Sequence, residues 1–437
     1  MIALRSKTAV LVLSGALSVG LVTAGCAQSG TSPTTSQPVS GSGSVSAGGE
    51  YWAGPAVTTT PMSARDAQAL DAATSAALSA DQDGATGFII GVWDPVKGFH
   101  IAAAGTDSTA GAPMRTDTHM YIGSVTKTAT AAAVLQLVDA HSLSLDDTVA
   151  TVLPDLAAEF PALAPITVRR LLDMSSGIPD YANVEKGGIL PIVWADPAHT
   201  FTNHDLIKIA LESNPVAPIG TAGYSNTNYI ILGEMLAKRT GGTPSAAVNA
   251  TLSKLGLTQT TLNPDPTSAL PSPGSAGYYG AAEGLNAAAH GYNYGAKTDV
   301  TGWNRSWAGT AGGISSTAED LAKFAASGFG TTLLSPSLAA ERTTGVTLGD
   351  FSAAVGLYGL GVGVRGDWLN HEGQLIGWEA FAFYNRRTGA VAAILTNSSG
   401  SMPSAQAVLK PYFPEIATYW DPTKAELAAA RNTPAPG

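Results

Sequence analysis

A serine and a lysine stand three positions apart in Ser124-Val125-Thr126-Lys127, shortly before an apolar run at 131–138. Residues at this spacing share one face of a helical turn, so the Lys127 amine can reach the Ser124 hydroxyl. The N-terminal end of a helix also carries partial positive charge, which helps a serine to lose its proton. Lys127 is the only lysine with a serine three positions before it. We therefore predict a nucleophile at Ser124 and its base at Lys127.

A second proton carrier is available in Tyr224-Ser225-Asn226, which directly precedes a helical segment. A tyrosine beside a lysine loses its proton more easily, because the positive charge stabilises the phenolate. An asparagine can donate to a substrate carbonyl and accept from Lys127 at the same time. The alternative is a packing tyrosine followed by a helix cap. We favour a catalytic Tyr224 and a substrate-binding Asn226, because the pair follows the serine and lysine in the chain.

Acyl transfer also needs a late strand whose backbone approaches the substrate closely, and three segments offer a suitable glycine. The glycine of 239–241 is explained as a helix C-cap, and that of 387–389 as part of a hairpin turn. The third segment, His371-Glu372-Gly373, precedes a long apolar strand. A lone histidine is often structural, but the position of this one favours a substrate-binding segment, with Gln374 next to it.

Metal chemistry is not expected from the histidines. His371-Glu372 begins like the zinc motif His-Glu-x-x-His, but Leu375 stands where the second histidine ligand would be. His199 and His204 are the other close pair, and their spacing does not put them on one helical face. We expect neither a metal nor another cofactor.

Periodicity and turn residues predict the elements that must position these groups. Strands are expected at 87–93, 98–104, 358–364, 378–384 and 390–396. Helices are expected at 64–80, 124–139, 168–174, 203–213, 226–240, 244–255, 316–326 and 403–412. Ser316 with Glu319 resembles a capping box for one of these helices. The segment 263–304, rich in Gly, Pro, Tyr and Ala, is expected to be a long loop beside the site.

The order of these elements is strands, a long helical middle, and strands again. It predicts an α/β (α+β) fold in which an antiparallel sheet, assembled from both ends of the chain, is flanked by helices. A mostly helical subdomain, at about 140–345, would be inserted into a domain that spans 56–420. A tail would occupy 421–437.

The three motifs together resemble the serine β-lactamase and penicillin-binding-protein superfamily, in its class C β-lactamase, DD-peptidase and esterase branch. Weaker matches cover roughly 64–409. They are found at 166–172, 176–181, 220–221, 226–232, 312–317 and 320–321.

The resemblance implies a role for each motif residue. Ser124 would be the acylated nucleophile, Lys127 its base and Tyr224 the proton shuttle to the leaving group. Asn226 would orient the substrate, and the backbone N–H groups of Ser124 and Gln374 would form the oxyanion hole. The expected activity is hydrolysis of esters or amides through an acyl-enzyme. The alternatives are a DD-carboxypeptidase or β-lactamase, and a non-catalytic penicillin-binding lipoprotein.

Two positions in the third motif depart from many relatives. His371 replaces a common lysine, which would make the local charge depend on pH near neutrality. Glu372 stands where relatives that act on β-lactams or D-Ala-D-Ala ends often have a hydroxyl residue that contacts the substrate carboxylate. A carboxylate there would repel such substrates. Neutral esters or amine-bearing substrates are therefore favoured, unless Glu372 points away from the cleft or pairs with an arginine.

The N-terminus predicts export. Arg5 and Lys7 precede an apolar run at 9–22, which is typical of a signal peptide at 1–25. Val22-Thr23-Ala24-Gly25-Cys26 resembles a bacterial lipobox, so Cys26, the only cysteine, is expected to carry lipid and anchor the protein to the membrane. The alternative is an ordinary signal peptide with an inert Cys26. Residues 26–55 are rich in Ser, Gly, Thr, Pro and Ala and are expected to be a flexible tether.

Composition limits the partners. Charged residues make up 13% of the chain and apolar residues 45%, so a large core can form, and the formal net charge is −10. Without the signal peptide 21 basic and 33 acidic residues remain, a net charge of −12. Because the chain has no basic cluster, nucleic-acid binding is not expected. The expected substrate is a small molecule or a cell-wall peptide.

Overall fold

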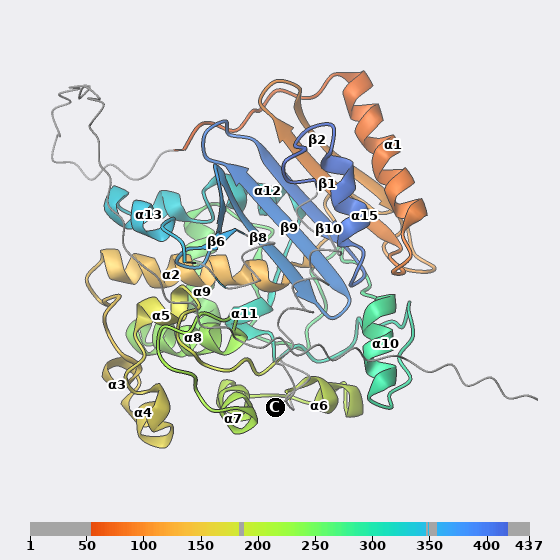
Figure 1. The fold of residues 1–437 in the computed structure, drawn as a ribbon. Helices are drawn as coiled ribbons and strands as arrows, with labels where there is room; N and C mark the ends of the chain where they lie inside the picture. The colour runs from red at the N-terminus through yellow and green to blue at the C-terminus, as the bar shows by residue number, and fades with distance from the viewer. Residues whose placement is uncertain (1–53, 183–187, 347, 349–355, 418–437) are drawn as a thin grey trace, which may run out of the picture.

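The computed structural model describes residues 54–182, 188–346, 348 and 356–417. Its main sheet has seven antiparallel strands in the order β2-β1-β10-β9-β8-β7-β6 (Figure 1). The strands are β1 (Gly87–Asp94), β2 (Gly98–Gly105), β6 (Leu357–Tyr358), β7 (Gly363–Arg365), β8 (Trp368–Leu375), β9 (Trp378–Asn385) and β10 (Val391–Thr396). The first strand β1 pairs with β2 on one side and with the last strand β10 on the other, so the prediction of a sheet built from both chain ends is confirmed.

Helices cover both faces of this sheet. Alternate residues of β1 point to opposite sides, as strand geometry requires. Phe88 and Ile90 pack with α1 (Ala64–Ala80) and α15 (Met402–Gln406), whereas Ile89 belongs to the core shared with α12 (Ala318–Ala326) and α2 (Thr126–Asp139). Both faces of the central strands are therefore apolar, and Figure 1 shows α1 and α15 beside them.

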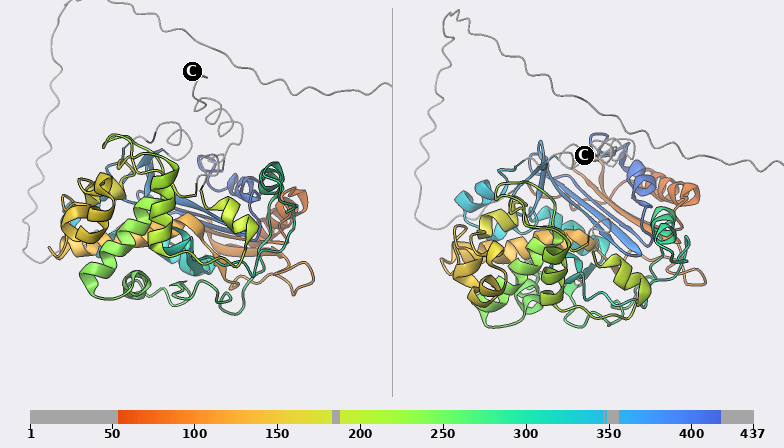
Figure 2. Two further views of the ribbon diagram at one scale, coloured as in Figure 1. Left: turned by 90° about the horizontal axis from the view of Figure 1, so that it is seen from below. Right: turned by 60° about the horizontal axis from the view of Figure 1, so that its bottom comes forward.

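The middle of the chain is mostly helical and lies to one side of the sheet (Figure 2). Its helices are α3 (Val149–Val152), α4 (Pro154–Glu159), α5 (Val168–Leu172), α6 (Leu190–Ala195), α7 (Asn203–Ser213), α8 (Asn226–Thr240), α9 (Pro244–Lys254), α10 (Ala281–Ala289), α11 (Gly309–Gly312) and α13 (Pro336–Arg342). A small antiparallel sheet, made of β3 (Met120–Tyr121), β5 (Ile314–Ser316) and β4 (Thr261–Leu262), lies among them. The expected α/β architecture with its helical middle is observed.

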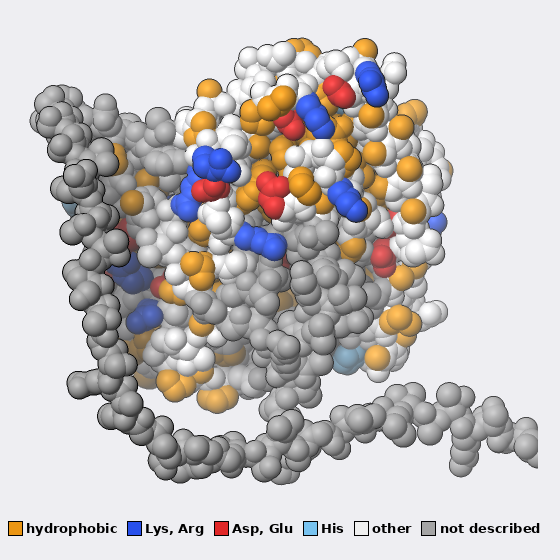
Figure 3. Space-filling model, turned by 45° about the horizontal axis from the view of Figure 1, so that its top comes forward, with side chains coloured by type: hydrophobic (Ala, Val, Ile, Leu, Met, Phe, Trp, Pro, Cys, Tyr) orange, Lys and Arg blue, Asp and Glu red, His pale blue; other side chains and the backbone are white. Residues whose placement is uncertain are grey.

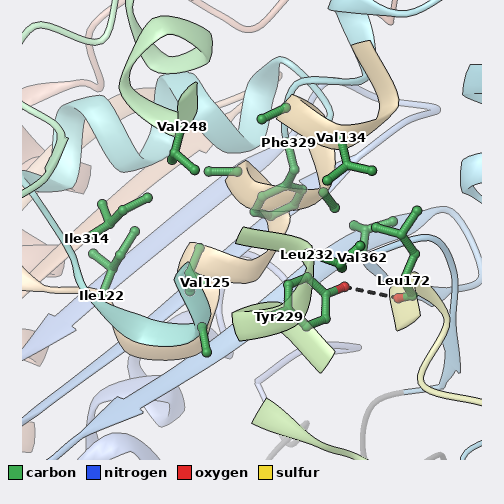
Figure 4. Close-up of a cluster of buried hydrophobic side chains, with 14 of the residues drawn as sticks. Ile122, Val125, Val134, Leu172, Tyr229, Leu232, Val248, Ile314, Phe329 and Val362 are labelled. Carbon is green, nitrogen blue, oxygen red and sulfur yellow. Dashed lines mark hydrogen bonds between the residues drawn. The ribbon is translucent and has the colours of Figure 1, made fainter. Parts of the chain in front are cut away.

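The helix α2 runs through the centre of the molecule. All its residues from Thr126 to Leu135 are buried, which explains the apolar run in the sequence. Figure 4 shows Val125 and Val134 among buried side chains of α8, α9 and β5. In the same cluster the Tyr229 hydroxyl donates to the Leu172 carbonyl oxygen over 3.0 Å. This packing fixes the start of α2, where the predicted nucleophile and base lie.

Several predicted boundaries agree with the structure because they depend on local caps. The helix α7 begins after Thr202, whose side chain forms a capping box with Asp205. The helix α8 ends at Gly241, which has a φ of +69°, so the glycine of 239–241 is the C-cap that was predicted. The glycine of 387–389 likewise lies in the turn between β9 and β10.

Three predicted elements are wrong in detail. Ser316 does not cap α12, because it pairs with Met120 in the small sheet, and Thr317 caps the helix instead. The strand expected at 358–364 is two short strands, β6 and β7, separated by a turn with Gly361 at a φ of +75°. The helix expected at 403–412 ends as an α-helix at Gln406, and a 3₁₀ turn (Ala407–Leu409) follows.

The segment 263–304 is not entirely a loop, since it contains α10. Its fold depends on aromatic contacts that sequence periodicity does not report. Trp194 of α6 donates its indole N–H to the Tyr279 hydroxyl over 2.5 Å. Tyr294 meets Trp303 edge to face, with ring centroids 4.9 Å apart. The helices α6 and α13 were not predicted either. Both are short, and each has a proline in its first turn.

The surface carries mixed charge. On the face in Figure 3, basic and acidic side chains are interspersed among apolar and uncharged ones. Nucleic-acid backbones are usually bound by a continuous basic stripe, which this face does not present. Among the helices of the described residues, none is long and apolar enough to cross a lipid bilayer.

Candidate active site

Ser124 and Lys127 lie on two successive elements rather than on one helix. Ser124 is in a 3₁₀ turn, η1 (Gly123–Val125), and Lys127 is in the first turn of α2. The sequence had predicted one helix from 124 to 139. Side chains three residues apart are eclipsed in a 3₁₀ turn, which brings this pair together. The Lys127 Nζ lies 2.9 Å from the Ser124 Oγ.

The Lys127 amine is completely buried and has three hydrogen-bond partners. Besides Ser124 it contacts the Asn226 Oδ1 and the Ala311 carbonyl oxygen, each at 2.7 Å. Burial lowers the pKa of Lys127 to about 7, against an opposing effect of the Asp180 carboxylate. A substantial fraction of the amine is therefore neutral at pH 7 and able to accept a proton.

Tyr224 lies immediately before α8, and its ring centroid is 5.0 Å from the Lys127 Nζ. Burial raises the pKa of Tyr224 well above its usual value, Tyr358 and Glu372 raise it further, and a hydrogen bond with Ser124 acts in the opposite direction. The expectation that Lys127 would ease the loss of the Tyr224 proton is therefore wrong, because desolvation dominates. Tyr224 is a neutral phenol near neutral pH, able to donate a hydrogen bond.

Asn226 is the first residue of α8, and its side chain is held from both sides. Its Oδ1 accepts from Lys127, while its Nδ2 lies 3.1 Å from each carboxylate oxygen of Asp180. The backbone N–H of Asn226 also donates to Asp180 over 3.1 Å. Sequence reasoning did not select Asp180 as a site residue, although it lies in the weaker match at 176–181. The available signal for Asp180 was a carboxylate in a stretch that otherwise has mainly apolar, glycine and proline residues.

Successive residues of β8 face opposite sides of the sheet. His371 is 3% exposed, and its Nε2 lies 3.0 Å from the Tyr358 hydroxyl. Its Nδ1 lies 2.5 Å from the Glu372 carbonyl oxygen. Burial and the nearby Lys127 amine lower the pKa of His371 to about 3. The predicted change of charge near neutral pH is therefore wrong, because His371 is neutral there.

Two glycines allow η1 to lie directly against β8. A Cβ atom on Gly373 would be 1.9 Å from the Ile122 carbonyl oxygen and 2.9 Å from the Ser124 nitrogen. A Cβ atom on Gly123, whose φ is +49°, would be 2.6 Å from the Gln374 nitrogen. Only residues without a side chain permit this approach. It brings the backbone of Ser124 and that of Gln374 side by side.

A cavity of about 270 Å³ opens above this junction. Six of the eight predicted catalytic and substrate-binding residues line it, Lys127 lies beneath it, and His371 is not among its lining residues. The lining residues are Ser124, Tyr181, Ala182, Tyr224, Asn226, Trp307, Ala308, Ala311, Gly312, Glu372, Gly373, Gln374, Leu375, Glu379, Ala380, Phe381 and Met402. Among these described lining residues there is no lysine or arginine to pair with a substrate carboxylate.

Glu372 gives this wall its acidic character. Its side chain keeps some solvent contact, and no described residue forms a hydrogen bond or ion pair with its carboxyl group. Loss of hydration raises the pKa of Glu372 to about 8. The carboxyl group is therefore mostly protonated at pH 7, and its repulsion of anions begins at higher pH. The residues described contain no cluster of three or more His, Cys, Asp or Glu side chains suited to a metal ion.

Comparison with known proteins agrees with this arrangement. The β-lactamase family matches residues 67–410. The chain is 33% identical over 157 residues to penicillin-binding protein 4 of Amycolatopsis lactamdurans and 31% identical over 157 residues to the esterase EstB of Burkholderia gladioli. These alignments cover 36% and 34% of this chain and 39% of each relative. The chain thus matches about two fifths of the length of these curated relatives.

A solved structure extends the likeness over most of the chain. The D-stereospecific amidohydrolase of a Streptomyces species has a TM-score of 0.63 and 28% identity, covering 80% of this chain and 98% of that one. The chain belongs to the β-lactamase family, and it shares the fold of this amidohydrolase. The expected superfamily and fold class are confirmed, and the class C, DD-peptidase and esterase branch stays a prediction.

Proposed function

We propose that this chain is a serine hydrolase that attacks esters or amides through an acyl-enzyme on Ser124. The observation that carries the proposal is the 2.9 Å contact between the Lys127 amine and the Ser124 hydroxyl at the base of a cavity. Neutral Lys127 takes the proton of Ser124 as its oxygen bonds to the substrate carbonyl carbon. Tyr224, a neutral phenol at the start, gives its proton to the leaving group and is reprotonated by the Lys127 ammonium, which returns to the neutral amine. Water then releases the acyl group by the same steps.

The oxyanion of the tetrahedral intermediate needs donors at the junction of η1 and β8. The backbone N–H groups of Ser124 and Gln374 are the candidates, because Gly123 and Gly373 allow the two segments to touch. Removal of one such donor typically costs an enzyme about 3–4 kcal/mol of transition-state stabilisation. Asn226 completes the site, because it orients the substrate and accepts a hydrogen bond from Lys127.

The cavity wall favours neutral or amine-bearing substrates. Its described lining residues include Glu372 and Glu379 but no lysine or arginine. A bound ammonium group would favour the ionised form of Glu372, whereas a substrate carboxylate would find no cation there. The similarity to an esterase and to a D-stereospecific amidohydrolase supports activated esters and amides of amino acids as the first substrates to test.

A second candidate activity is penicillin binding or DD-carboxypeptidase action. The similarity to penicillin-binding protein 4 favours it. The same acylation chemistry would serve a β-lactam or a D-Ala-D-Ala peptide. The absence of a basic side chain among the described residues of the cavity wall makes these carboxylates the poorer substrates.

Labelling with a serine-directed fluorophosphonate tests the activity. We expect stoichiometric labelling of the wild type at Ser124, and neither labelling nor ester hydrolysis in Ser124→Ala. Ser142→Ala, which changes an exposed serine, is the matched control and should behave as the wild type. Turnover above trace level in Ser124→Ala would refute the assignment of the nucleophile.

The proposed location is the outer side of the cell membrane, with Cys26 lipidated. The signal peptide, the tether, Cys26 and the tail lie outside the described residues, so this proposal depends on the lipobox-like sequence alone. Wild-type protein should partition into a detergent phase, and Cys26→Ser should stay in the aqueous phase or remain unprocessed. Mass spectrometry that finds an unmodified Cys26 in the mature protein would contradict the anchor.

A further inference from the structure

Asp180 lies behind the proposed catalytic residues and contacts one of them. Its carboxylate accepts from the backbone N–H of Asn226 and from the Asn226 Nδ2, all at 3.1 Å. The Ala182 N–H adds a further contact of 3.1 Å. Because an ionised carboxylate can only accept hydrogen bonds, it binds the NH₂ group of the Asn226 amide and not its oxygen. The oxygen end then points to Lys127, at 2.7 Å.

We propose that Asp180 is a positioning residue, which fixes the Asn226 amide with its oxygen toward Lys127 and supplies the charge that balances the Lys127 ammonium formed during acylation. This inference rests on the proposed function. It deepens the description of the site by adding a fourth member to the chain Ser124–Lys127–Asn226.

The acylation step creates a positive charge on Lys127, which the Asp180 carboxylate would stabilise. The O–H bond of Ser124 breaks, its proton moves to the lone pair of Lys127, and the oxygen bonds to the substrate carbonyl carbon. The carbonyl π electrons move to the oxygen, so a buried ammonium and an oxyanion form together. The ammonium donates to the Asn226 Oδ1. Burial raises the pKa of Asp180, whereas the N–H donors of Ala182 and Asn226 and the Lys127 charge lower it. In the proposed role the carboxyl group of Asp180 is ionised beside the ammonium. Isolated buried charge is costly, so a nearby negative group stabilises this state.

The alternative is that Asp180 only holds the chain in place, and other contacts already do so. The hydroxyls of Ser225 and Thr227 donate to the Pro179 carbonyl oxygen over 3.2 and 2.7 Å, and the Tyr181 N–H donates to the Thr227 Oγ1 over 3.2 Å. The segment around Asp180 is therefore tied to the start of α8 without the carboxylate. Substitution of its side chain should spare the fold.

Other ionisable groups around Lys127 do not replace Asp180. The phenols of Tyr224 and Tyr229 face the Lys127 Nζ with ring centroids at 5.0 and 5.7 Å. His371, from β8, is neutral near pH 7. Glu372 acts on Tyr224 and is itself mostly protonated at pH 7. Asp180 is thus the negative group that Lys127 reaches through Asn226.

Two substitutions separate the charge of Asp180 from its hydrogen bonds to Asn226. Asp180→Asn keeps a hydrogen-bond acceptor but loses the charge. Asp180→Ala loses both and leaves the Asn226 amide free to rotate. We expect kcat for an activated ester to fall about tenfold in the first and about 100-fold in the second, the range found for residues that orient catalytic groups. KM should change less than twofold. Rates are expressed per folded protein, measured by circular dichroism.

The pH profile is the readout that a merely structural residue would not move. Because the Asp180 charge raises the pKa of Lys127, its removal lowers that pKa. The acid limb of kcat/KM should therefore move to lower pH in Asp180→Asn. Asp173→Asn is the matched control, because Asp173 is a buried carboxylate of the same region that accepts from the backbone N–H and the hydroxyl of Ser175. It should keep the wild-type kcat and acid limb.

Three outcomes would overturn the role. Unchanged kcat and an unchanged acid limb in both Asp180 variants would exclude positioning and charge balance. An equal loss in Asp173→Asn would show a general effect of buried carboxylates on folding. A wild-type protein that neither takes the fluorophosphonate nor hydrolyses esters would overturn the proposed function, and this role with it, so the two failures are distinguishable.

Discussion

The floor of the cavity and its β8 wall are built in opposite ways. On the floor, each polar side-chain group of Ser124, Lys127 and Asn226 has a protein partner within 3.1 Å. On the wall, the carboxyl group of Glu372 has no such partner among the described residues. Groups that are fixed by the core are preorganised for one reaction. A group without a protein partner responds to pH and to the substrate.

This difference suggests that the floor and the wall have different functions. The core fixes how a carbonyl would be attacked, and the wall decides which carbonyl compounds are accepted. Substitutions on the floor should therefore lower the rate for every substrate. Substitutions on the wall should change the ratio between substrates.

Loss of the amine on the floor should have the largest effect. Lys127→Met removes the proposed base but keeps the length of the side chain, and kcat/KM for an activated ester should fall about 10²–10⁴-fold. Lys323→Met, at a lysine that is paired with Glu319 on the surface of α12, is the control. Retention of more than one tenth of the wild-type rate in Lys127→Met would assign the base elsewhere.

A substitution that separates the floor from the β8 wall should have the second-largest effect on the rate. Gly373→Ala places a Cβ atom 1.9 Å from the Ile122 carbonyl oxygen, so η1 must move away from β8. A shift of about 1 Å costs about 100-fold in rate. Gly302→Ala meets no atom within 4 Å and serves as control. Equal steady-state rates in both variants would show that the oxyanion donors are not at this junction.

The pH profile of the wild type tests the floor without any substitution. The acid limb of kcat/KM should lie near pH 7, because the pKa of Lys127 is lowered to about 7 and only the neutral amine accepts a proton. Below that pH the rate should fall about tenfold per unit as Lys127 becomes protonated. His371, with its pKa lowered to about 3, should add no step between pH 5 and 8. A limb near pH 5 would contradict a neutral Lys127 as the base.

The wall should give the smallest and most selective effect. Above pH 8 Glu372 is ionised, so Glu372→Gln should raise acylation by a penicillin up to about tenfold relative to a neutral ester. At pH 6.5 the two proteins should differ little, because Glu372 is then protonated. Glu212→Gln, on the exposed face of α7, is the control. The same ratio of kcat/KM values at pH 6.5 and pH 9 in both proteins would show that Glu372 does not face the substrate.

The sequence determined what depends on neighbours along the chain. The bounds of α1, α7 and α8 agree with the prediction because caps such as Thr202 and Gly241 act within a few residues. The spacing of Ser124 and Lys127 also predicted their contact, since any helical turn brings such residues together. The alternation of strands and helices predicted the sheet from both ends of the chain.

The tertiary structure decided what depends on distant segments. Pairing with Met120 made Ser316 a strand residue, and burial next to Tyr358 made His371 a neutral group away from the cavity lining. Desolvation raised the pKa values of Tyr224 and Glu372, although the sequence suggested a more acidic phenol and a carboxylate. The sequence contains these side chains, but their hydration and their partners arise only when separate segments of the chain are packed together.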